Sequence, residues 1–68
     1  MQLKINGKNR ELSDSGVLLH VLRQLDIEPE NGGVAVALND VVVPRSQWET
    51  TTVADGDRIE IIHAVQGG

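Results

Sequence analysis

The chain has no cysteine, phenylalanine or tyrosine, and Trp48 is its only aromatic residue. The absence of cysteine excludes disulfide bonds, thiolate metal sites and a cysteine nucleophile. No apolar run approaches the ~20 residues that a membrane-spanning helix needs, and residues 1–5 alternate instead of forming the apolar stretch of a signal peptide. Basic residues number six against ten acidic ones, and the net charge of -4 argues against binding to nucleic acid or to an anionic membrane. A small chain without disulfides suits a reducing compartment, so we expect a cytoplasmic protein.

The 68 residues leave room for one hydrophobic core, built mainly from Val, Ile, Leu and Ala. A domain of this size buries only about 60% of the surface that its unfolded chain exposes. We expect a single domain over residues 1–64 and a short tail over residues 65–68.

Alternating residues predict a strand over residues 2–5 and a returning strand over residues 8–12. Asn6-Gly7 between them is a strong hairpin signal, because both residues of such a turn must accept a positive φ. A helix follows, in which Asp14 or Ser15 could cap the first turn. Its apolar stripe has the spacing i, i+3, i+4 and i+7, at Leu18, Val21, Leu22 and Leu25.

The helix is expected to stop near Asp26, because Pro29 disfavours helical geometry in the residue before it. The second half of the chain predicts further short elements separated by turn residues. These elements are strands over residues 34–38, 41–43 and 58–64 and a helical turn over residues 46–48.

The resulting order is hairpin, helix, then strands. One helix must bury its stripe on one face of a sheet, which gives a two-layer α+β domain. This is the order of the β-grasp, or ubiquitin-like, fold, and we expect a mixed sheet of four to five strands. The predicted core consists of Leu3, Ile5, Leu18, Val21, Leu22, Leu25, Val36, Leu38, Ile59 and Ile61.

Few side chains are arranged for chemistry. His20 and His63 belong to no metal-binding motif and are expected on the helix surface and at a strand end. Asp55 and Asp57 flank a glycine, as in a tight turn whose aspartates bond the backbone, and Glu60 adds no acid–base pattern. Gly32-Gly33 leads into a strand, whereas a phosphate-binding loop leads into a helix. We therefore expect no enzymatic activity, no cofactor and no metal in this chain alone.

The terminal Gly67-Gly68 needs an explanation, because glycine is flexible and buries nothing. A disordered end of no function is the simpler interpretation. The functional interpretation is a carboxylate delivered into a partner's active site, where residues without Cβ fit a narrow channel. We expect residues 65–68 to be mobile in the free protein, since nothing offsets the entropy of ordering two glycines.

Several stretches together resemble one family over essentially the whole chain. The sequence is similar to the small sulfur carrier proteins of bacterial thiamine thiazole synthesis, which are ubiquitin-like. A departure is Val17, where that family leads us to expect a hydroxyl residue that caps the helix. The stretches that carry the resemblance are Leu38-Asn39, Val43-Pro44-Arg45-Ser46-Gln47-Trp48, Asp55-Gly56-Asp57, Ile59-Glu60-Ile61-Ile62 and Ala64-Val65-Gln66-Gly67-Gly68.

The resemblance implies a chemistry at Gly68. An adenylyltransferase of the ubiquitin-activating type would use ATP to convert the Gly68 carboxylate to an acyl-adenylate. Sulfur from a persulfide donor protein would then displace AMP and leave a thiocarboxylate, which thiazole synthase would accept. Val65, Gln66 and Gly67 would lie in the partner's channel.

Two other functions fit the same pattern. The small subunit of molybdopterin synthase is also a β-grasp sulfur carrier ending in Gly-Gly, although a longer chain with more aromatic residues is expected there. A ubiquitin-like modifier or interaction domain would instead be found joined to lysines of other proteins, with no thiocarboxylate form.

A docking surface is predicted from strand alternation. If Ile59 and Ile61 point into the core, Glu60 and Ile62 point to the open face of the sheet. Ala35 and Ala37 lie on the same open face if Val34, Val36 and Leu38 point inward. Val42 also lies there if Val41 and Val43 point inward. Scattered apolar side chains of no function are the alternative. A shared patch beside the tail is the functional interpretation, with negative charge steering the chain toward basic partners.

Overall fold

The computed structural model describes residues 1–13, 16–30 and 32–63, which form five strands, one α-helix and one 3-10 helix. Strands β1 (Gln2–Ile5) and β2 (Lys8–Glu11) form the predicted antiparallel hairpin. Asn6 and Gly7 take φ values of 49° and 83° at the turn between them. Both values lie in the left-handed region that such a two-residue turn requires.

Helix α1 (Leu18–Gln24) buries the predicted stripe but begins differently from our expectation. The capping position is Val17, which makes no side-chain capping bond, so the expectation that Asp14 or Ser15 caps the helix is wrong. The backbone N–H groups of Leu18 and Leu19 donate instead to the carbonyl oxygens of Thr51 (2.8 Å) and Trp48 (2.9 Å). A neighbouring loop therefore satisfies the donors that a capping side chain usually takes. Asp14 and Ser15 themselves lie outside the described residues.

The helix ends at Gln24, two residues before the expected Asp26. The amides of Leu25 and Asp26 donate to the carbonyl oxygens of Leu22 and Arg23, which tightens the last turn. Asp26 then adopts a φ of 62° and directs the chain away from the helix axis.

The second half of the chain contains β3 (Val34–Leu38), β4 (Val41–Val42), the 3-10 helix η1 (Arg45–Gln47) and β5 (Arg58–His63). Strand β3 has the predicted bounds. Strand β4 ends at Val42, one residue earlier than predicted, although the Val43 N–H still donates to the Val36 carbonyl oxygen (2.9 Å) and the Val43 side chain is buried. Helix η1 begins one residue earlier than predicted, directly after Pro44. The last strand is described as far as His63, and Ala64 lies outside the described residues.

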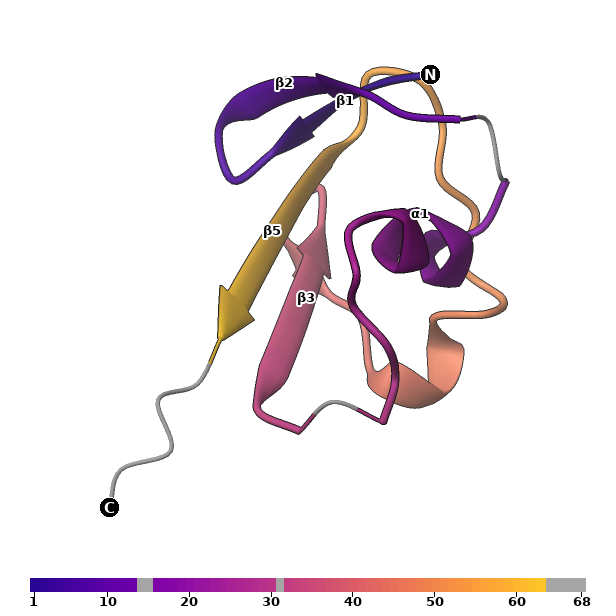
Figure 1. Cartoon of the computed structure of the whole chain (residues 1–68), viewed down its shortest axis with the longest axis vertical. Helices are drawn as coiled ribbons and strands as arrows, with labels where there is room; N and C mark the ends of the chain where they lie inside the picture. Colours follow the sequence, from indigo (N-terminus) through magenta and orange to yellow (C-terminus); the bar gives the residue numbers. More distant parts are fainter. Residues whose placement is uncertain (14–15, 31, 64–68) are drawn as a thin grey trace.

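The strands form one sheet in the order β2-β1-β5-β3-β4. Strand β5 lies in the centre, parallel to β1 and antiparallel to β3. Helix α1 covers one face of this mixed sheet, and β5 runs from the β1–β2 hairpin toward the opposite end of the molecule (Figure 1). The predicted two-layer α+β architecture, with one helix on a mixed sheet, is confirmed.

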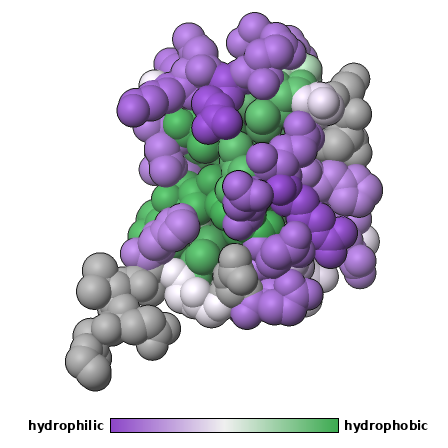
Figure 2. All heavy atoms as spheres, in the orientation of Figure 1, coloured by the Kyte–Doolittle hydropathy of each residue, from purple (hydrophilic) through white to green (hydrophobic). Residues whose placement is uncertain are grey.

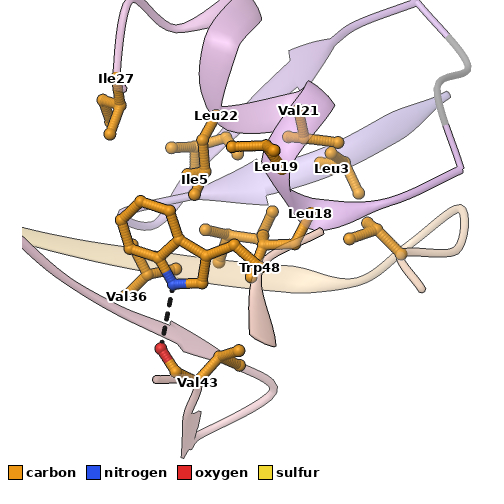
Figure 3. Close-up of a cluster of buried hydrophobic side chains, with 12 residues drawn as sticks. Leu3, Ile5, Leu18, Leu19, Val21, Leu22, Ile27, Val36, Val43 and Trp48 are labelled. Atoms are coloured by element: carbon orange, nitrogen blue, oxygen red, sulfur yellow. Dashed lines mark hydrogen bonds between the residues drawn. The ribbon is translucent and has the colours of Figure 1, made fainter. Parts of the chain in front are cut away.

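The core lies between α1 and the sheet (Figure 3). Most of the predicted core residues are buried, but Leu25, Leu38 and Ile61 are only half-buried at its margin. Trp48 is 1% exposed and fills the space beside β3. The buried residues that were not predicted share a position in a loop or at a helix margin, namely Leu19, Ile27, Val43, Trp48 and Val53.

Candidate functional site

The face of the sheet opposite α1 holds the predicted docking residues in two adjoining rows. Cross-strand register pairs Ala35 with Ile62, and it pairs Ala37 with both Glu60 and Val42. Residues paired in this way project from the same face. The open-face patch is defined here as Ala35, Ala37, Val42, Glu60 and Ile62.

Two large apolar side chains of the patch are exposed to solvent. Ile62 is 61% exposed and Val42 is 70% exposed, while Ala37 is half-buried. Ala35 and Glu60 are also exposed. Figure 2 shows hydrophobic surface over the region of β5 and β3, with hydrophilic side chains around it. The prediction that these five side chains share the open face agrees with the register.

The prediction for Val42 assumed that the neighbouring Val41 points into the core, but Val41 is exposed. It is 65% exposed, although its cross-strand partner Leu38 lies on the helix side of the sheet. Strand β4 has only two residues and forms an edge of the sheet, a position that leaves Val41 exposed. Val43 does point inward and is buried.

The other end of the open face is charged. Lys4 and Arg58 lie opposite each other in the parallel β1–β5 pair. The Arg58 guanidinium pairs with the Asp40 carboxylate at 2.7 Å. Polarity therefore changes along β5, from charged at its start to apolar at Ile62, one residue before the end of the strand.

The candidate acid–base residues have structural roles. Asp55 Oδ1 accepts a hydrogen bond from the Gln2 backbone N–H (2.6 Å), and Asp57 Oδ2 accepts one from the Ala54 N–H (2.8 Å). The Asp57 bond is the local turn bond that the sequence predicts, whereas the Asp55 bond joins the turn to the start of β1. His20 is exposed on α1 and His63 is exposed at the end of β5, as predicted. Within residues 1–13, 16–30 and 32–63, no group of three or more His, Asp or Glu side chains could hold a metal ion.

Two asparagines that sequence reasoning treated only as turn residues contact the central strand. Asn6 Oδ1 accepts a hydrogen bond from the Ile61 N–H (2.7 Å), and its Nδ2 donates to the Ile61 carbonyl oxygen (3.2 Å). Asn39 Oδ1 accepts a hydrogen bond from the Arg58 N–H (2.9 Å). Each asparagine directly follows a strand that flanks β5, and this shared position is the signal that could have revealed them.

The predicted tail residues Val65, Gln66, Gly67 and Gly68 lie outside the described residues, and so does the expectation that they are mobile. None of the described helices is long and apolar enough to cross a membrane.

Comparisons with known proteins agree with the resemblance in the sequence. The model of the ThiS family matches residues 3–68. The sulfur carrier protein ThiS of Escherichia coli (strain K12) is 34% identical over 68 residues, covering all of both chains. A thiazole synthase of Paramagnetospirillum magneticum is 37% identical over 68 residues, which are all of this chain and 20% of that protein.

Solved structures show the same similarity. The crystal structure of the thiamine biosynthesis protein ThiS from Geobacter metallireducens has a TM-score of 0.82 and 33% identity, and both chains are covered completely. A solution structure of a thiamine biosynthesis protein from the same organism has a TM-score of 0.79 and 32% identity, covering all of this chain and 88% of that one. The chain belongs to the ThiS family, the sulfur carrier proteins of thiamine biosynthesis.

Proposed function

We propose that the Gly68 carboxylate is the group that holds sulfur. An adenylyltransferase of the ubiquitin-activating type joins this carboxylate to the α-phosphorus of ATP and releases pyrophosphate. The outer sulfur of a persulfide donor protein then attacks the acyl carbon and displaces AMP. A second thiol reduces the acyl disulfide so formed, which leaves a thiocarboxylate on Gly68 and a disulfide on the donor side.

The family match supports this proposal because it extends through residue 68 and so includes Gly67-Gly68. The absence of cysteine adds a chemical reason. A chain without a thiol cannot hold sulfur as its own persulfide, so a terminal carboxylate is the suitable group. Use of ATP by the partner favours a cytoplasmic location.

Thiazole synthase is the proposed acceptor of the sulfur. Support comes from the Paramagnetospirillum magneticum thiazole synthase, in which a segment 37% identical to this whole chain occupies 20% of the protein. A carrier-like segment in the same polypeptide as the acceptor has a high effective concentration at that active site. We propose that the separate carrier reaches its acceptor by docking.

The open-face patch is the proposed docking surface for both partners. Ile62 and Val42 expose apolar surface to water, and this exposure does not stabilise the free chain. Ile62 also lies one residue from the end of β5, so a partner that covers the patch is close to the root of the tail. The carboxylate of Glu60 within the patch favours a basic residue on the partner.

The chain acts in this scheme as a substrate of its partners and not as an enzyme. Its most suggestive carboxylates both accept hydrogen bonds from the backbone, Asp55 from the Gln2 N–H of β1 and Asp57 from the Ala54 N–H. The ATP site and the sulfur-transfer groups therefore belong to other proteins.

Intact-mass measurement tests the proposal. The purified chain is incubated with ATP, the adenylyltransferase of the same organism, a persulfide donor and a thiol that reduces the acyl disulfide. In the expected product one oxygen atom of the chain is replaced by a sulfur atom, so its mass rises by the difference between these two atoms. Fragmentation should place the change at Gly68. A matched reaction without ATP should leave the mass unchanged.

The same measurement addresses the other functions. A product joined to a lysine of another protein, with no thiocarboxylate, would contradict the sulfur-carrier chemistry and indicate a modifier. Transfer of the sulfur to thiazole synthase separates this carrier from a subunit of molybdopterin synthase.

A further inference from the structure

We infer that Asn6 is a positioning residue that fixes the end of β5 from which the tail leaves. This inference rests on the proposed adenylation of Gly68, because it concerns how the carrier is presented to the adenylating partner. It assigns to the Asn6 side chain a role beyond that of a turn residue.

Strand β5 has unequal support along its length. Strand β3 pairs with it from Ile59 to His63, whereas β1 pairs with it only at Arg58 and Ile59. Strand β1 ends at Ile5, where the chain turns away into the hairpin. The second half of β5 therefore has a neighbouring strand on one side only.

The Asn6 side chain takes the place of the missing strand. The backbone N–H of Asn6 donates to the Ile59 carbonyl oxygen at 2.9 Å, which continues the ladder between β1 and β5 by one step. Its side-chain amide then bonds both the N–H and the carbonyl oxygen of Ile61, at 2.7 Å and 3.2 Å. One side chain thus satisfies both backbone groups of Ile61, which a continuation of strand β1 would otherwise pair.

The chemistry of this position favours asparagine. A φ of 49° is left-handed, which glycine, asparagine and aspartate tolerate better than other residues. Of these, only asparagine offers an acceptor and a donor together at neutral pH. The turn and the contact with β5 therefore require the same residue.

Asn39 makes an equivalent contact at the other end of β5. Its φ is 50°, its N–H donates to the Arg58 carbonyl oxygen (2.8 Å), and its Oδ1 accepts from the Arg58 N–H (2.9 Å). Its Nδ2 donates to Asp57 Oδ1 (3.1 Å). Asn39 is thus a matched control, because it bonds the start of β5, away from the tail.

The location of Ile61 gives the Asn6 contact its consequence for function. Ile61 lies between Glu60 and Ile62 of the open-face patch, two residues before the described end of β5. Without the Asn6 amide, this half of the strand opens more often and must be ordered again when a partner docks. Such a cost weakens binding and leaves the chemical step of the bound complex unchanged.

The experiment compares Asn6→Gly with Asn39→Gly. Glycine accepts the left-handed φ, so each variant removes the amide without new backbone strain. Adenylation is followed by ATP–pyrophosphate exchange with the carrier varied, alongside thermal unfolding and hydrogen exchange at the Ile61 amide. We expect Asn6→Gly to raise the KM for the carrier by about fivefold or more, with kcat within about twofold. It should also lose protection at Ile61.

Asn39→Gly should lower the melting temperature to a similar extent and change KM by less than about twofold. Equal changes of KM in the two variants, or an unchanged KM in Asn6→Gly, would overturn the inference. A wild-type chain that is not adenylated at all contradicts the proposed function instead, so the two failures are distinguishable.

Asn6→Asp provides a second test that does not depend on removing the side chain. Its carboxylate keeps the acceptor for the Ile61 N–H but sets a charged oxygen against the Ile61 carbonyl oxygen. Protonation restores an O–H donor. The KM of this variant relative to wild type should therefore fall as the solution is acidified from neutral pH. A ratio that does not change with pH contradicts the inference.

Discussion

The indole Nε1 of Trp48 donates a hydrogen bond to the Val43 carbonyl oxygen at 3.0 Å (Figure 3). The ring is 1% exposed, and the guanidinium of Arg45 lies 5.5 Å from its centroid. Val43 follows β4 directly, and Trp48 follows η1. This one contact therefore joins the end of the sheet to the segment that supports the start of α1.

Trp48→Phe should remove this hydrogen bond and keep most of the apolar volume. The Val43 carbonyl oxygen would lose its donor in a buried place, which costs about 1–3 kcal/mol in the free energy of unfolding. Urea unfolding followed by circular dichroism measures it, since fluorescence is lost with the only tryptophan. Arg45→Ala is the control and should cost less than about 1 kcal/mol through the lost contact with the ring. A Phe variant as stable as wild type would contradict this account.

Periodicity is the reason that part of the core could be predicted and part could not. Leu18, Val21 and Leu22 repeat with the helical spacing, so the buried face of α1 was evident from the sequence. Trp48 and Val53 lie in irregular segments, where no spacing indicates burial. Their burial depends on the path of the chain between η1 and β5, which local sequence does not define.

Side-chain contacts across the sheet were beyond prediction for a different reason. Strand alternation placed Ile62 and Ala35 on one face, and the register agrees. It could not show that the asparagines of two turns bond to β5, because that contact needs the strand order. It also could not show that Val41 is exposed, because this depends on the place of β4 at the edge of the sheet.

Leu22→Ala should destabilise the domain far more than Leu25→Ala. Leu22 is 0% exposed, so its truncation leaves a cavity and costs about 2–5 kcal/mol. Leu25 lies at the helix end and is half-buried, so the loss should be clearly smaller. Chemical denaturation of both variants gives the comparison. Equal losses would mean that the helix packs along a wider face than described.

Val17→Thr should bring little of the stability that a capping residue usually adds. Such a residue is worth about 1 kcal/mol where the first amides of the helix lack partners. Here the amides of Leu18 and Leu19 are already bonded to Thr51 and Trp48. We expect a gain below about 0.5 kcal/mol by thermal unfolding. A full capping gain would indicate that these loop bonds are weak in solution.

Ile62→Asp should weaken docking without unfolding the chain. A charge in the centre of an apolar contact is costly, so the affinity for the adenylyltransferase and for thiazole synthase should fall by about tenfold or more. Binding is measured by calorimetry with each partner, and folding by thermal melt.

Val41→Asp is the matched control for this prediction. Val41 is as exposed as Ile62 but lies outside the open-face patch. Both variants should cost no more than about 1 kcal/mol in stability, the range of strand propensities. Unchanged binding by Ile62→Asp, or an equal loss in both variants, would rule out the patch as the docking surface.

Gly67→Ala should fold as wild type does and be adenylated more slowly. The added methyl group would meet the wall of a channel that fits residues without Cβ. Pyrophosphate release measures the rate, and circular dichroism checks the fold. A rate equal to that of wild type would argue against a narrow channel.

The central place of β5 has a mechanical consequence for a carrier that is held by its end. Tension applied to the C-terminus in the direction of β5 enters the folded domain through this strand. The ladders to β1 and β3 run beside that axis, and their hydrogen bonds lie across it. The load is therefore shared by many bonds in shear, whereas an edge strand peeled sideways would lose them one at a time. A central β5 should therefore let the domain resist a pull on its C-terminal end better than an edge strand would.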